Sequence, residues 1–598
     1  MPTQAARTRA CFLDVEQSLG GKRWEARNGD ERMARALAQR LGLPEVVGRV
    51  MAGRGVDLEH AEGYLNPSLK TDLPDPSGFK DMDAAAERLA RAVMAGEPMA
   101  LFADYDVDGG TSAALLGRFL TAVGAEPRIY VPDRLNEGYG PNVPALQRLR
   151  DEGYKLIVCL DCGTTAHEPL EAAASMGLEV VVADHHEAEP KLPPALALVN
   201  PNRLDESGAH GQMAAVGVTF LLVVAVNRAL RAAGAYGGER AEPDLRRWLD
   251  LVALGTVCDV VPLTGVNRAL VARGLDVLAQ RRNAGIAALC DVARLDEKPT
   301  PFHLGFLLGP RVNAGGRVGR ADLGARLLST DMPGEAARIA EELDRLNTER
   351  KELEAQVLEA ALAQVEAEGT PEGMVFAAGE GWHPGVIGIV ASRLMERYDL
   401  PALVVALDGN GQGKGSGRSV RGVDLGGAVI AARQAGLLID GGGHTMAAGL
   451  TVAADAMAEA RDFLRERLTR ALTTSGYVPS LGLDGAVNPR GATAELVRTL
   501  ERLGPYGTGN AEPRFAVPQA QIVKPEVVGE KHVRCYLTGP DGGRLKAIAF
   551  RSVDRPLGRA LLENRGVPLH VAGKLRLDQW AGRDNVQLII EDAAAAGR

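Results

Sequence analysis

Short apolar runs that alternate with helical stretches dominate the chain between residues 98 and 201. Five runs are typical of buried strands: PMALFADYD, EPRIYVPD, KLIVCLDCG, LEVVVADHH and ALALVNP. Stretches such as SAALLGRFLTAV and EPLEAAASMG, which have the character of helices, separate most of them. This alternation predicts a doubly wound α/β domain built on a parallel sheet.

Helical patterns lie on both sides of this region. Residues up to about Glu97 are typical of helices with a central loop, and another helical stretch is expected at 243–279. From Pro333 to Gly369, apolar residues recur at helical spacing among many charges. That pattern predicts one long connecting helix.

In roughly the last 230 residues, the pattern of apolar and polar positions changes twice. A smaller, glycine-rich α/β region begins at Met374, and short β-like runs separated by turn residues after Ser480 predict a small β-barrel. We therefore expect five parts: a helical N-terminal extension packed on the first α/β domain (1–80), that domain (81–330), the connecting helix (331–370), the second α/β domain (371–478) and the barrel (479–598).

Composition indicates an ordinary globular protein. A chain of 598 residues is too long for one core, and its contents of 46% hydrophobic and 24% charged residues are unexceptional. No apolar run has the length of a membrane span, and the N-terminus lacks the apolar segment of a signal peptide, so we expect a cytoplasmic protein. Six scattered cysteines form no disulfide framework, and Cys159 and Cys162 lack the second pair that a zinc site needs.

The net charge of −9 does not exclude a nucleic-acid substrate, because binding depends on local fields rather than on the total charge. From Ser480 onward, 17 Lys+Arg stand against 13 Asp+Glu. The predicted barrel could therefore provide a basic track for a DNA strand, with an ordinary solvated surface as the alternative. The candidate residues are Lys524, Lys531, Arg534, Lys546, Lys574 and Arg576.

Acidic and imidazole side chains follow three of the predicted strands. Since the carboxyl ends of parallel strands bind ligands, we expect these side chains at one edge of the sheet: Asp104, Asp106, Asp108, Asp161, Asp184, His185 and His186. So many carboxylates repel one another unless cations neutralise them, and oxygen ligands with one or two imidazoles suit Mn²⁺ or Mg²⁺. Helix capping by aspartate is the alternative; it explains one or two of these positions but not all of them.

Ten segments resemble those of a known family. DYDVDGGTSAALL, LDCGTT, ADHHE and LGTVCDVVPL are similar, in order and spacing, to the four motifs of the DHH phosphoesterase superfamily. LGPRVNAGGRVGRA, GWHPGVIGIVASRL, GSGRSVRGVDL and GGGHTMAAGL resemble the RecJ family and its DHH-associated domain, while PYGTGNAEPRF and VQLIIED resemble its oligonucleotide-binding (OB) barrel. The resemblance covers Phe79 to Asp592 and implies a DHH catalytic domain, a DHH-associated domain and a C-terminal OB-fold.

This resemblance implies a catalytic centre with two divalent ions, Mn²⁺ or Mg²⁺. Asp106 and Asp108 would bind different ions, and Asp161 would bridge them. His185 and Asp259 would complete the second ion's coordination. Two such ions activate a water for in-line attack on phosphorus, so the protein needs no nucleophile of its own.

Two more residues receive roles from the resemblance, and one position departs from it. His186 would face the substrate phosphate or the bridging water, and Asp104 would be an auxiliary carboxylate at the metals. Phe102 stands where many relatives carry a histidine. The first metal site is therefore expected to bind its ion more weakly or to depend on Asp104.

Further residues are candidates for contacts with DNA: Tyr139, Arg311, Asn313, Arg317, Ser416, Arg418, Arg421 and His444. For Arg311, Asn313 and Arg317, pairing with acidic residues between domains is an equal alternative to clamping phosphate. For the glycine-rich stretch with Ser416 and Arg418, the alternative is a tight loop with solvated charges. Tyr139 could stack on a base or simply pack against its neighbours.

The resemblance as a whole implies a 5′→3′ exonuclease that degrades single-stranded DNA to 5′-mononucleotides in DNA repair and recombination. It also implies a monomer that works away from membranes, with a single-strand-binding protein and a recombination helicase as partners. One alternative is a DHH phosphodiesterase for small substrates such as oligoribonucleotides, cyclic dinucleotides or pyrophosphate, against which the terminal barrel argues. A non-catalytic DNA-binding scaffold is the other, against which the filled acidic motifs argue.

Overall fold

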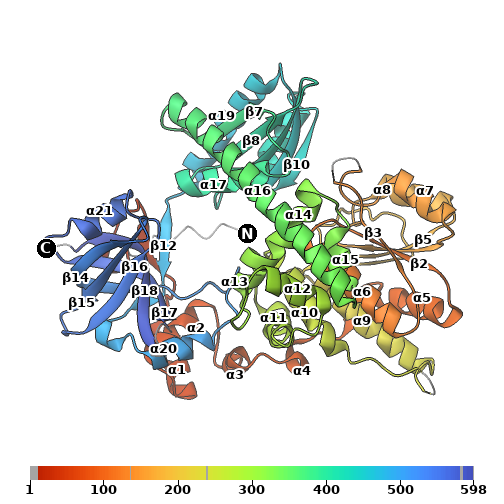
Figure 1. Cartoon of the computed structure of the whole chain (residues 1–598), viewed down its shortest axis with the longest axis horizontal. Helices are drawn as coiled ribbons and strands as arrows, with labels where there is room; N and C mark the ends of the chain where they lie inside the picture. Colours follow the sequence, from red (N-terminus) through yellow and green to blue (C-terminus); the bar gives the residue numbers. More distant parts are fainter. Residues whose placement is uncertain (1–10, 135–136, 238–239, 579–583, 597–598) are drawn as a thin grey trace. The chain divides into compact units, whose positions relative to one another are not determined.

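The computed structural model describes residues 11–134, 137–237, 240–578 and 584–596 (Figure 1). The chain forms two compact units. The larger contains Asp75–Asp259 and Gly274–Tyr477, and the smaller contains the described parts of Met1–Pro74, Val260–Arg273 and Val478–Arg598.

A five-stranded parallel sheet forms the centre of the first domain in the larger unit. Its strands are β2 (Met99–Ala103), β3 (Arg128–Tyr130), β4 (Leu156–Leu160), β5 (Glu179–Ala183) and β6 (Ala197–Val199), in the order β3-β2-β4-β5-β6. Every residue of β2 and β4 is buried, as in strands covered on both faces. The order reverses beside β2, which confirms the doubly wound sheet and creates a topological switch point between β2 and β4.

Helices cover both faces of this sheet. On one face, Leu146 of α7 and Leu170 of α8 pack with Phe102 and Ile157 of the strands. Helix α9 packs against both α5 and α6, and all three helices contact strands of the sheet. The helical segments of this domain are η2 (Pro76–Gly78), α5 (Met82–Ala95), α6 (Val107–Ala122), α7 (Val143–Asp151), α8 (His167–Ser175), α9 (Ala215–Ala232), η3 (Leu245–Trp248), α10 (Leu249–Cys258), α12 (Ala284–Val292), α13 (Pro301–His303), η4 (Leu304–Leu308), α14 (Gly309–Val318) and α15 (Leu323–Ser329).

Helix α9 is, within the part of the chain that the structure describes, the one helix long and apolar enough to cross a membrane. Its apolar window is 72% buried inside the protein. Packing against α5, α6 and α10 accounts for its composition, as expected for the central helix of a globular domain.

The helical stretch expected at 243–279 is interrupted in the structure. Helix α10 ends at Cys258, and α11 (Gly265–Leu278) begins six residues after Asp259. Val260 adopts a positive φ of 63°, and Pro262 lacks the N–H that a continuing helix requires. The break leaves Asp259 at the C-terminal end of α10.

The expected connecting helix is α16 (Pro333–Glu368). It leads into a second sheet with the order β10-β11-β9-β8-β7, in which only β7 and β8 are parallel. The elements of this second domain are β7 (Val375–Glu380), α17 (Ile387–Tyr398), β8 (Ala402–Leu407), β9 (Gln412–Arg418), α18 (Leu425–Gln434), β10 (Asp440–His444), β11 (Ala447–Ala453) and α19 (Met457–Ser475).

A closed barrel forms the centre of the smaller unit. Strands β14 (Phe515–Val528), β15 (His532–Thr538), β16 (Arg544–Ala549), β18 (Asn585–Ala595) and β17 (Leu569–Asp578) pair in succession, and β17 pairs back with β14. This closure confirms the predicted OB-fold. The unit also contains η1 (Phe12–Asp14), β1 (Arg23–Ala26), α1 (Glu31–Leu41), α2 (Glu45–Gly53), α3 (Ala61–Leu65), α4 (Leu69–Asp72), β12 (Ser480–Leu483), β13 (Gly485–Ala486), η5 (Pro489–Gly491), α20 (Ala494–Glu501) and α21 (Pro556–Leu562).

The N-terminal region differs from expectation in its packing. We expected residues 1–80 to pack on the first α/β domain, but Leu37, Val47 and Met51 share a hydrophobic core with Phe515 and Val571 of the barrel. Strand β1, which the sequence pattern did not indicate, pairs in parallel with β12. Residues at the two ends of the chain thus build one core.

Candidate active site

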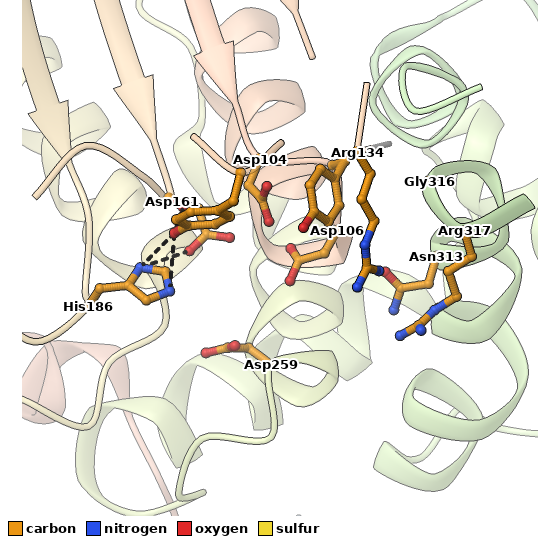
Figure 2. A pocket seen from close by; sticks show the side chains of 11 residues that line it. Asp104, Asp106, Arg134, Asp161, His186, Asp259, Asn313, Gly316 and Arg317 are labelled. Atoms are coloured by element: carbon orange, nitrogen blue, oxygen red, sulfur yellow. Dashed lines mark hydrogen bonds and ion pairs between the residues drawn. The ribbon is translucent and has the colours of Figure 1, made fainter. Parts of the chain in front are cut away.

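The acidic residues expected at the sheet edge converge at the switch point. Asp104 follows β2, Asp161 follows β4, and His186 follows β5. Figure 2 shows the side chains of Asp104, Asp106, Asp161, Asp259 and His186 around a common pocket. This is the position at which doubly wound sheets bind their ligands.

Two glycines allow the first acidic segment to approach its neighbours closely. Asp106 caps α6 by accepting hydrogen bonds from the backbone N–H groups of Asp108 and Gly109, at 2.8 and 3.1 Å. A Cβ at Gly109 would lie 2.4 Å from the Asp104 carbonyl oxygen, and one at Gly255 would lie 3.0 Å from an Asp108 carboxylate oxygen. Asp108 also accepts hydrogen bonds from the backbone N–H groups of Ala215 and Val216 at the start of α9, at 2.7 and 2.9 Å. Capping therefore accounts for one oxygen of Asp106 and for contacts of Asp108, but not for the carboxylates of Asp104, Asp161 and Asp259, each of which keeps one buried oxygen without a hydrogen-bond partner.

Asp161 is held in an unusual backbone conformation. Its φ is 60°, in the left-handed region, which costs a non-glycine residue about 1–2 kcal/mol. Its side chain is 3% exposed, and its Oδ1 lies 3.4 Å from Nε2 of His185. Local strain of this kind is found where a structure must aim one side chain at a functional site.

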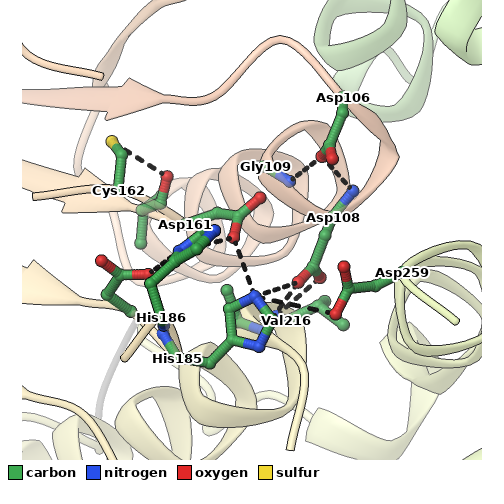
Figure 3. A network of polar contacts seen from close by, with 12 residues as sticks. Asp106, Asp108, Gly109, Asp161, Cys162, His185, His186, Val216 and Asp259 are labelled. Carbon is green, nitrogen blue, oxygen red and sulfur yellow. Dashed lines mark hydrogen bonds and ion pairs between the residues drawn. The ribbon is translucent and has the colours of Figure 1, made fainter. Parts of the chain in front are cut away.

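The two histidines are oriented by different partners (Figure 3). Nδ1 of His185 lies 3.0 Å from the carbonyl oxygen of Met213, so that Nδ1–H can donate to it and leave the Nε2 lone pair free for a ligand. That Nε2 faces three carboxylates, of Asp108 at 4.0 Å, Asp161 at 3.4 Å and Asp259 at 3.7 Å.

His186 is fixed between an aspartate and a tyrosine. Its Nδ1 lies 2.7 Å from Oδ1 of Asp184, and its ring nitrogens lie 3.2 Å from the Tyr139 hydroxyl, which donates to the carbonyl oxygen of Asp161 at 3.0 Å. Although burial opposes it, the hydrogen bond with His186 holds the pKa of Asp184 below its usual value. Tyr139 thus lines the pocket and positions His186, a role that its sequence context did not indicate.

Burial makes this cluster electrostatically unfavourable by itself. Burial and the charge of Asp106 raise the pKa of Asp108 to about 7, and burial and the charge of Asp108 raise that of Asp259 to about 9. The pKa values of Asp104 and Asp161 are also raised, mainly by burial and by neighbouring carboxylates. Among the described residues, no lysine or arginine forms an ion pair with these four carboxylates, so like charges share the site.

The donor set fits divalent cations. Three groups have ligand atoms within 4.8 Å of one another: Asp104, Asp106 and Asp161; Asp108, His185 and Asp259; and Asp161, His185 and His186. Among the described residues, one oxygen each of Asp104, Asp161 and Asp259 is buried without a hydrogen-bond partner. Buried carboxylate oxygens without donors are costly, and a hard cation satisfies them.

Phe102 contributes nothing to this donor set. Its side chain is fully buried on the sheet face that packs against α7 and α8, and its ring stacks on Tyr130 with centroids 5.3 Å apart. Asp104 joins Asp106 and Asp161 in the first group of ligand atoms. Asp104, rather than the side chain at position 102, lies within reach of a cation shared with Asp106 and Asp161.

Guanidinium groups line the other side of the pocket. Figure 2 shows Arg134 and Arg317 opposite the carboxylates, and Asn313 lies beside Arg317. Burial and the nearby charges of Arg134, Arg350 and Arg418 lower the pKa of Arg317 to about 10, and burial and Arg134 lower that of Arg418. Arg317 donates to the Gly385 carbonyl oxygen at 3.0 Å and Arg418 to the Gly417 carbonyl oxygen at 2.8 Å. Within the described residues, neither these two arginines nor Arg134 forms an ion pair with a carboxylate.

Guanidinium groups without carboxylate partners suit an anionic ligand such as a phosphate. Arg134 is the member that sequence reasoning missed. It lies in a segment between β3 and α7 without a motif of its own, and its cation–π contact with Tyr105, at 5.2 Å, appears only in the folded chain.

The remaining candidates for DNA contact differ in whether their side chains are already engaged within the protein. Arg418 donates to Ser416 Oγ at 3.2 Å, so these two act together, while Arg421 is exposed on the chain just beyond them. His444 is 64% exposed and lies 3.9 Å from Glu187, next to His186 in sequence. Arg311 is engaged elsewhere: its Nε pairs with Asp344 of α16 at 2.8 Å, and Nη1 donates to the Leu307 carbonyl. For Arg311, pairing with an acidic residue therefore describes the structure better than clamping of a phosphate does.

The expected basic track on the barrel is also largely neutralised. Lys574 pairs with Glu512 and Glu591, and Arg576 pairs with Glu512. Lys546 pairs with Asp578, and Arg534 pairs with Glu526. The solvated-surface alternative describes these four residues better than a continuous positive groove does.

Comparison with known proteins agrees with this geometry. Three family models match: the DHH family, N-terminal domain (residues 98–256), the DHHA1 domain (371–470) and the RecJ OB domain (483–592). The single-stranded-DNA-specific exonuclease RecJ of Escherichia coli (strain K12) is 36% identical over 563 residues, which cover 92% of this chain and 96% of that protein. The chain belongs to the RecJ family.

Solved RecJ structures share the fold. RecJ from Thermus thermophilus in complex with Mn²⁺ has a TM-score of 0.78 and 29% identity, over 96% of this chain and 79% of that chain. The same protein in complex with Mg²⁺ has a TM-score of 0.72 and 27% identity, over 96% and 78% of the two chains. The RecJ family resemblance expected from the motifs is thus confirmed, together with the DHH, DHH-associated and OB domains.

Proposed function

We propose that this RecJ-family protein is a metal-dependent exonuclease that removes 5′-mononucleotides from the 5′ end of single-stranded DNA. One observation carries the proposal: a nest of buried carboxylates and imidazoles faces a cluster of guanidinium groups across one pocket. An enzyme that hydrolyses a polyanion with the help of bound cations needs both clusters: the carboxylates and imidazoles to bind the cations, and the guanidinium groups to bind the phosphates.

Two Mn²⁺ or Mg²⁺ ions fit the ligand groups. Asp104 and Asp106 would hold one ion, and Asp108, His185 and Asp259 would hold the other. Asp161, which belongs to groups with both Asp106 and His185, would contribute to both. RecJ of Thermus thermophilus has been crystallised with either metal, which supports this choice. Divalent ions held there would acidify a water and balance the charge of the phosphate under attack.

The protein's own side chains orient the strand. Arg134, Arg317 and Arg418 would hold the terminal 5′-phosphate, where guanidinium forks can bind its oxygens bidentately. His186, braced by Asp184 and Tyr139, would then face the next phosphate. Attack of water on that phosphorus breaks its bond to the 3′-oxygen, which leaves with a proton and frees one 5′-mononucleotide.

The cellular location, the biological process and the partner proteins are inferred from the proposed substrate and the family. We expect the protein to act in the cytoplasm in DNA repair and recombination, as a monomer that cooperates with a single-strand-binding protein and a recombination helicase. Each of these is a proposal by analogy with the family and rests on no contact in the structure.

The decisive experiment offers single-stranded and duplex DNA, labelled at either end, with Mn²⁺, with Mg²⁺ and with a chelator. The expected result is rapid release of the 5′ label from single strands as a mononucleotide, and no release with the chelator. Faster hydrolysis of cyclic dinucleotides or dinucleotides would support the small-substrate alternative. Binding of DNA without hydrolysis under any metal would support a scaffold.

A further inference from the structure

The segment Gly381–Gly385, with the sequence GWHPG, contacts the guanidinium cluster although its residues are not among those that line the pocket. It follows β7 in the second domain, whereas Arg317 lies in the last turn of α14 in the first domain. Nη1 of Arg317 donates to the carbonyl oxygen of Gly385 at 3.0 Å. Among the described residues, this is the one hydrogen bond found for that guanidinium group, so it sets the direction of the side chain.

A tight turn holds the Gly385 carbonyl group in place. The backbone N–H of Val386 donates to the carbonyl oxygen of His383 at 3.1 Å, so residues 383–386 form a β-turn. Pro384 occupies the second position of this turn, where its fixed φ is favourable. The side chain of the first residue closes the turn, because Nδ1 of His383 accepts a hydrogen bond from the N–H of Gly385 at 3.0 Å. Asparagine and aspartate commonly make this contact in turns, and here a histidine makes it.

The histidine has the protonation state that this contact requires. An imidazole accepts a hydrogen bond at Nδ1 when the ring is neutral and carries its proton on Nε2. Burial lowers the pKa of His383 despite the opposing charge of Glu349. Since the ordinary pKa of histidine is about 6.5, the ring is neutral at neutral pH and can hold the turn.

Close packing places this segment against both sides of the guanidinium cluster. A Cβ at Gly385 would lie 2.5 Å from the carbonyl oxygen of Arg317, so the glycine contacts the backbone of that residue as well as its side chain. Three residues further on, a Cβ at Gly388 would lie 2.9 Å from Oγ of Ser416 and 3.2 Å from Nη2 of Arg418. A shift of the turn would therefore move the groups that we assign to the 5′-phosphate.

The neutral acceptor leaves the charge of Arg317 available. Burial and the charges of Arg134, Arg350 and Arg418 lower the pKa of Arg317 to about 10, so the like charges around it favour a displaced side chain. A carboxylate in place of the Gly385 carbonyl group would hold the side chain too, but it would neutralise the charge and compete with a phosphate. A carbonyl oxygen orients the guanidinium group without that competition.

We propose that His383 is a positioning residue for the 5′-phosphate, because it fixes the Gly385 carbonyl oxygen that orients Arg317. The inference rests on the proposed function and adds a residue to it. Gly385 engages one edge of the guanidinium group, and the group lines the pocket opposite the carboxylates (Figure 2). A guanidinium group that is already oriented loses less conformational freedom when it binds a phosphate. His383 acts through Gly385 and needs no contact with the strand.

The test compares wild type with His383→Leu and His383→Asn. Leucine removes the acceptor, whereas the side-chain oxygen of asparagine can accept from the Gly385 N–H in the same turn. KM and kcat are measured with Mn²⁺ on single strands that carry either a 5′-phosphate or a 5′-hydroxyl group. His532→Leu is the matched control, because Nδ1 of His532 accepts from the N–H of Arg551 at 2.8 Å in the other unit.

His383→Leu should raise KM for 5′-phosphorylated strands about 2- to 12-fold, the range for one hydrogen bond, and leave KM for 5′-hydroxyl strands unchanged. The value of kcat should stay the same, since the contact binds substrate and transition state alike. His383→Asn should restore the wild-type KM, and His532→Leu should leave the ratio of the two KM values unchanged. In an Arg317→Ala background, His383→Leu should have no further effect, because the side chain that it orients is absent.

Several outcomes would overturn the inference. An unchanged KM in His383→Leu, or an equal rise for both kinds of strand, would exclude a role in orienting a phosphate contact. Additive losses from His383→Leu and Arg317→Ala would show that the histidine acts by another route, and failure of asparagine to restore KM would exclude the acceptor. Partial unfolding cannot mimic the expected result, because KM does not depend on the fraction of active enzyme. Failure of the wild type to release nucleotides from single-stranded DNA would instead refute the proposed function, so the two failures are distinguishable.

Discussion

Replacing Asp161 by asparagine should abolish hydrolysis and, at the same time, make the metal-free protein more stable. Burial and the carboxylates of Asp108 and Asp106 raise the pKa of Asp161, so its charge is unfavourable without a cation. Asparagine keeps the shape of the side chain and removes the charge. It also tolerates the positive φ of 60°, whereas alanine would add strain of about 1–2 kcal/mol.

The size of the stabilisation follows from the spacing of the charges. Two unit charges about 4 Å apart at an effective dielectric constant near 20 repel by about 4 kcal/mol. Partial protonation of the carboxylates and the nearby His185 reduce this repulsion. We therefore expect Asp161→Asn to raise the free energy of unfolding of the metal-free protein by about half of it, about 2 kcal/mol, at pH 8. For a domain of this size, that corresponds to a rise in melting temperature of about 4–8 °C.

Thermal unfolding with a chelator and with Mn²⁺, together with release of labelled nucleotides, tests this reasoning. Wild type should gain about 2.7 kcal/mol at 100 times its dissociation constant for Mn²⁺, and Asp161→Asn should gain much less. Asp462→Asn, a surface change in the same unit, should leave both readouts within about 0.5 kcal/mol. A metal-free variant that melts below wild type would refute the electrostatic argument, and near-normal turnover would refute the assignment of Asp161 as a ligand.

Three further predictions concern protons, the 5′ end and Arg311. The pKa values of Asp108 and Asp259 are raised to about 7 and about 9, so the folded metal-free protein keeps protons that the unfolded chain releases above about pH 4. The melting temperature of the metal-free protein should therefore fall from pH 5 to pH 9. Calorimetry should show the affinity for Mn²⁺ rising over the same range. Arg134→Gln should raise KM for 5′-phosphorylated strands about 10- to 150-fold, and much less for 5′-hydroxyl strands; an equal loss for both would exclude a terminal-phosphate contact. Arg311→Ala should lower the melting temperature by breaking the pair with Asp344, and a raised KM without loss of stability would instead restore its role as a phosphate clamp.

Motifs that follow strands were the most predictable part of the molecule. A run such as KLIVCLDCG indicates both a buried strand and the residue that emerges from its end, so Asp161 could be placed at the sheet edge from the pattern alone. Asp259 lies at a helix end, where periodicity predicted a continuous helix. Its role came from the family resemblance, since apolar residues continue at helical spacing past the break that Val260 and Pro262 cause.

Features that depend on distant pairing were not predictable. Whether Arg311 is free or paired depends on Asp344, 33 residues away, and the charge of the barrel surface depends on which acidic residues meet Lys574 and Arg576. Arg134 became a candidate only when the fold brought it beside Arg317 and Arg418. Composition counts charges, whereas binding depends on which charges remain uncompensated after folding.

The same reasoning explains why two opposite clusters can share one pocket. Carboxylates and guanidinium groups this close would be expected to pair with one another, yet Arg317 and Arg418 keep lowered pKa values and Asp108 and Asp259 keep raised ones. Each cluster is therefore held apart from its natural partner by the fold, at a cost in stability. A cation on the acidic side and a phosphate on the basic side remove that cost together, so metal and DNA should each bind more tightly in the presence of the other.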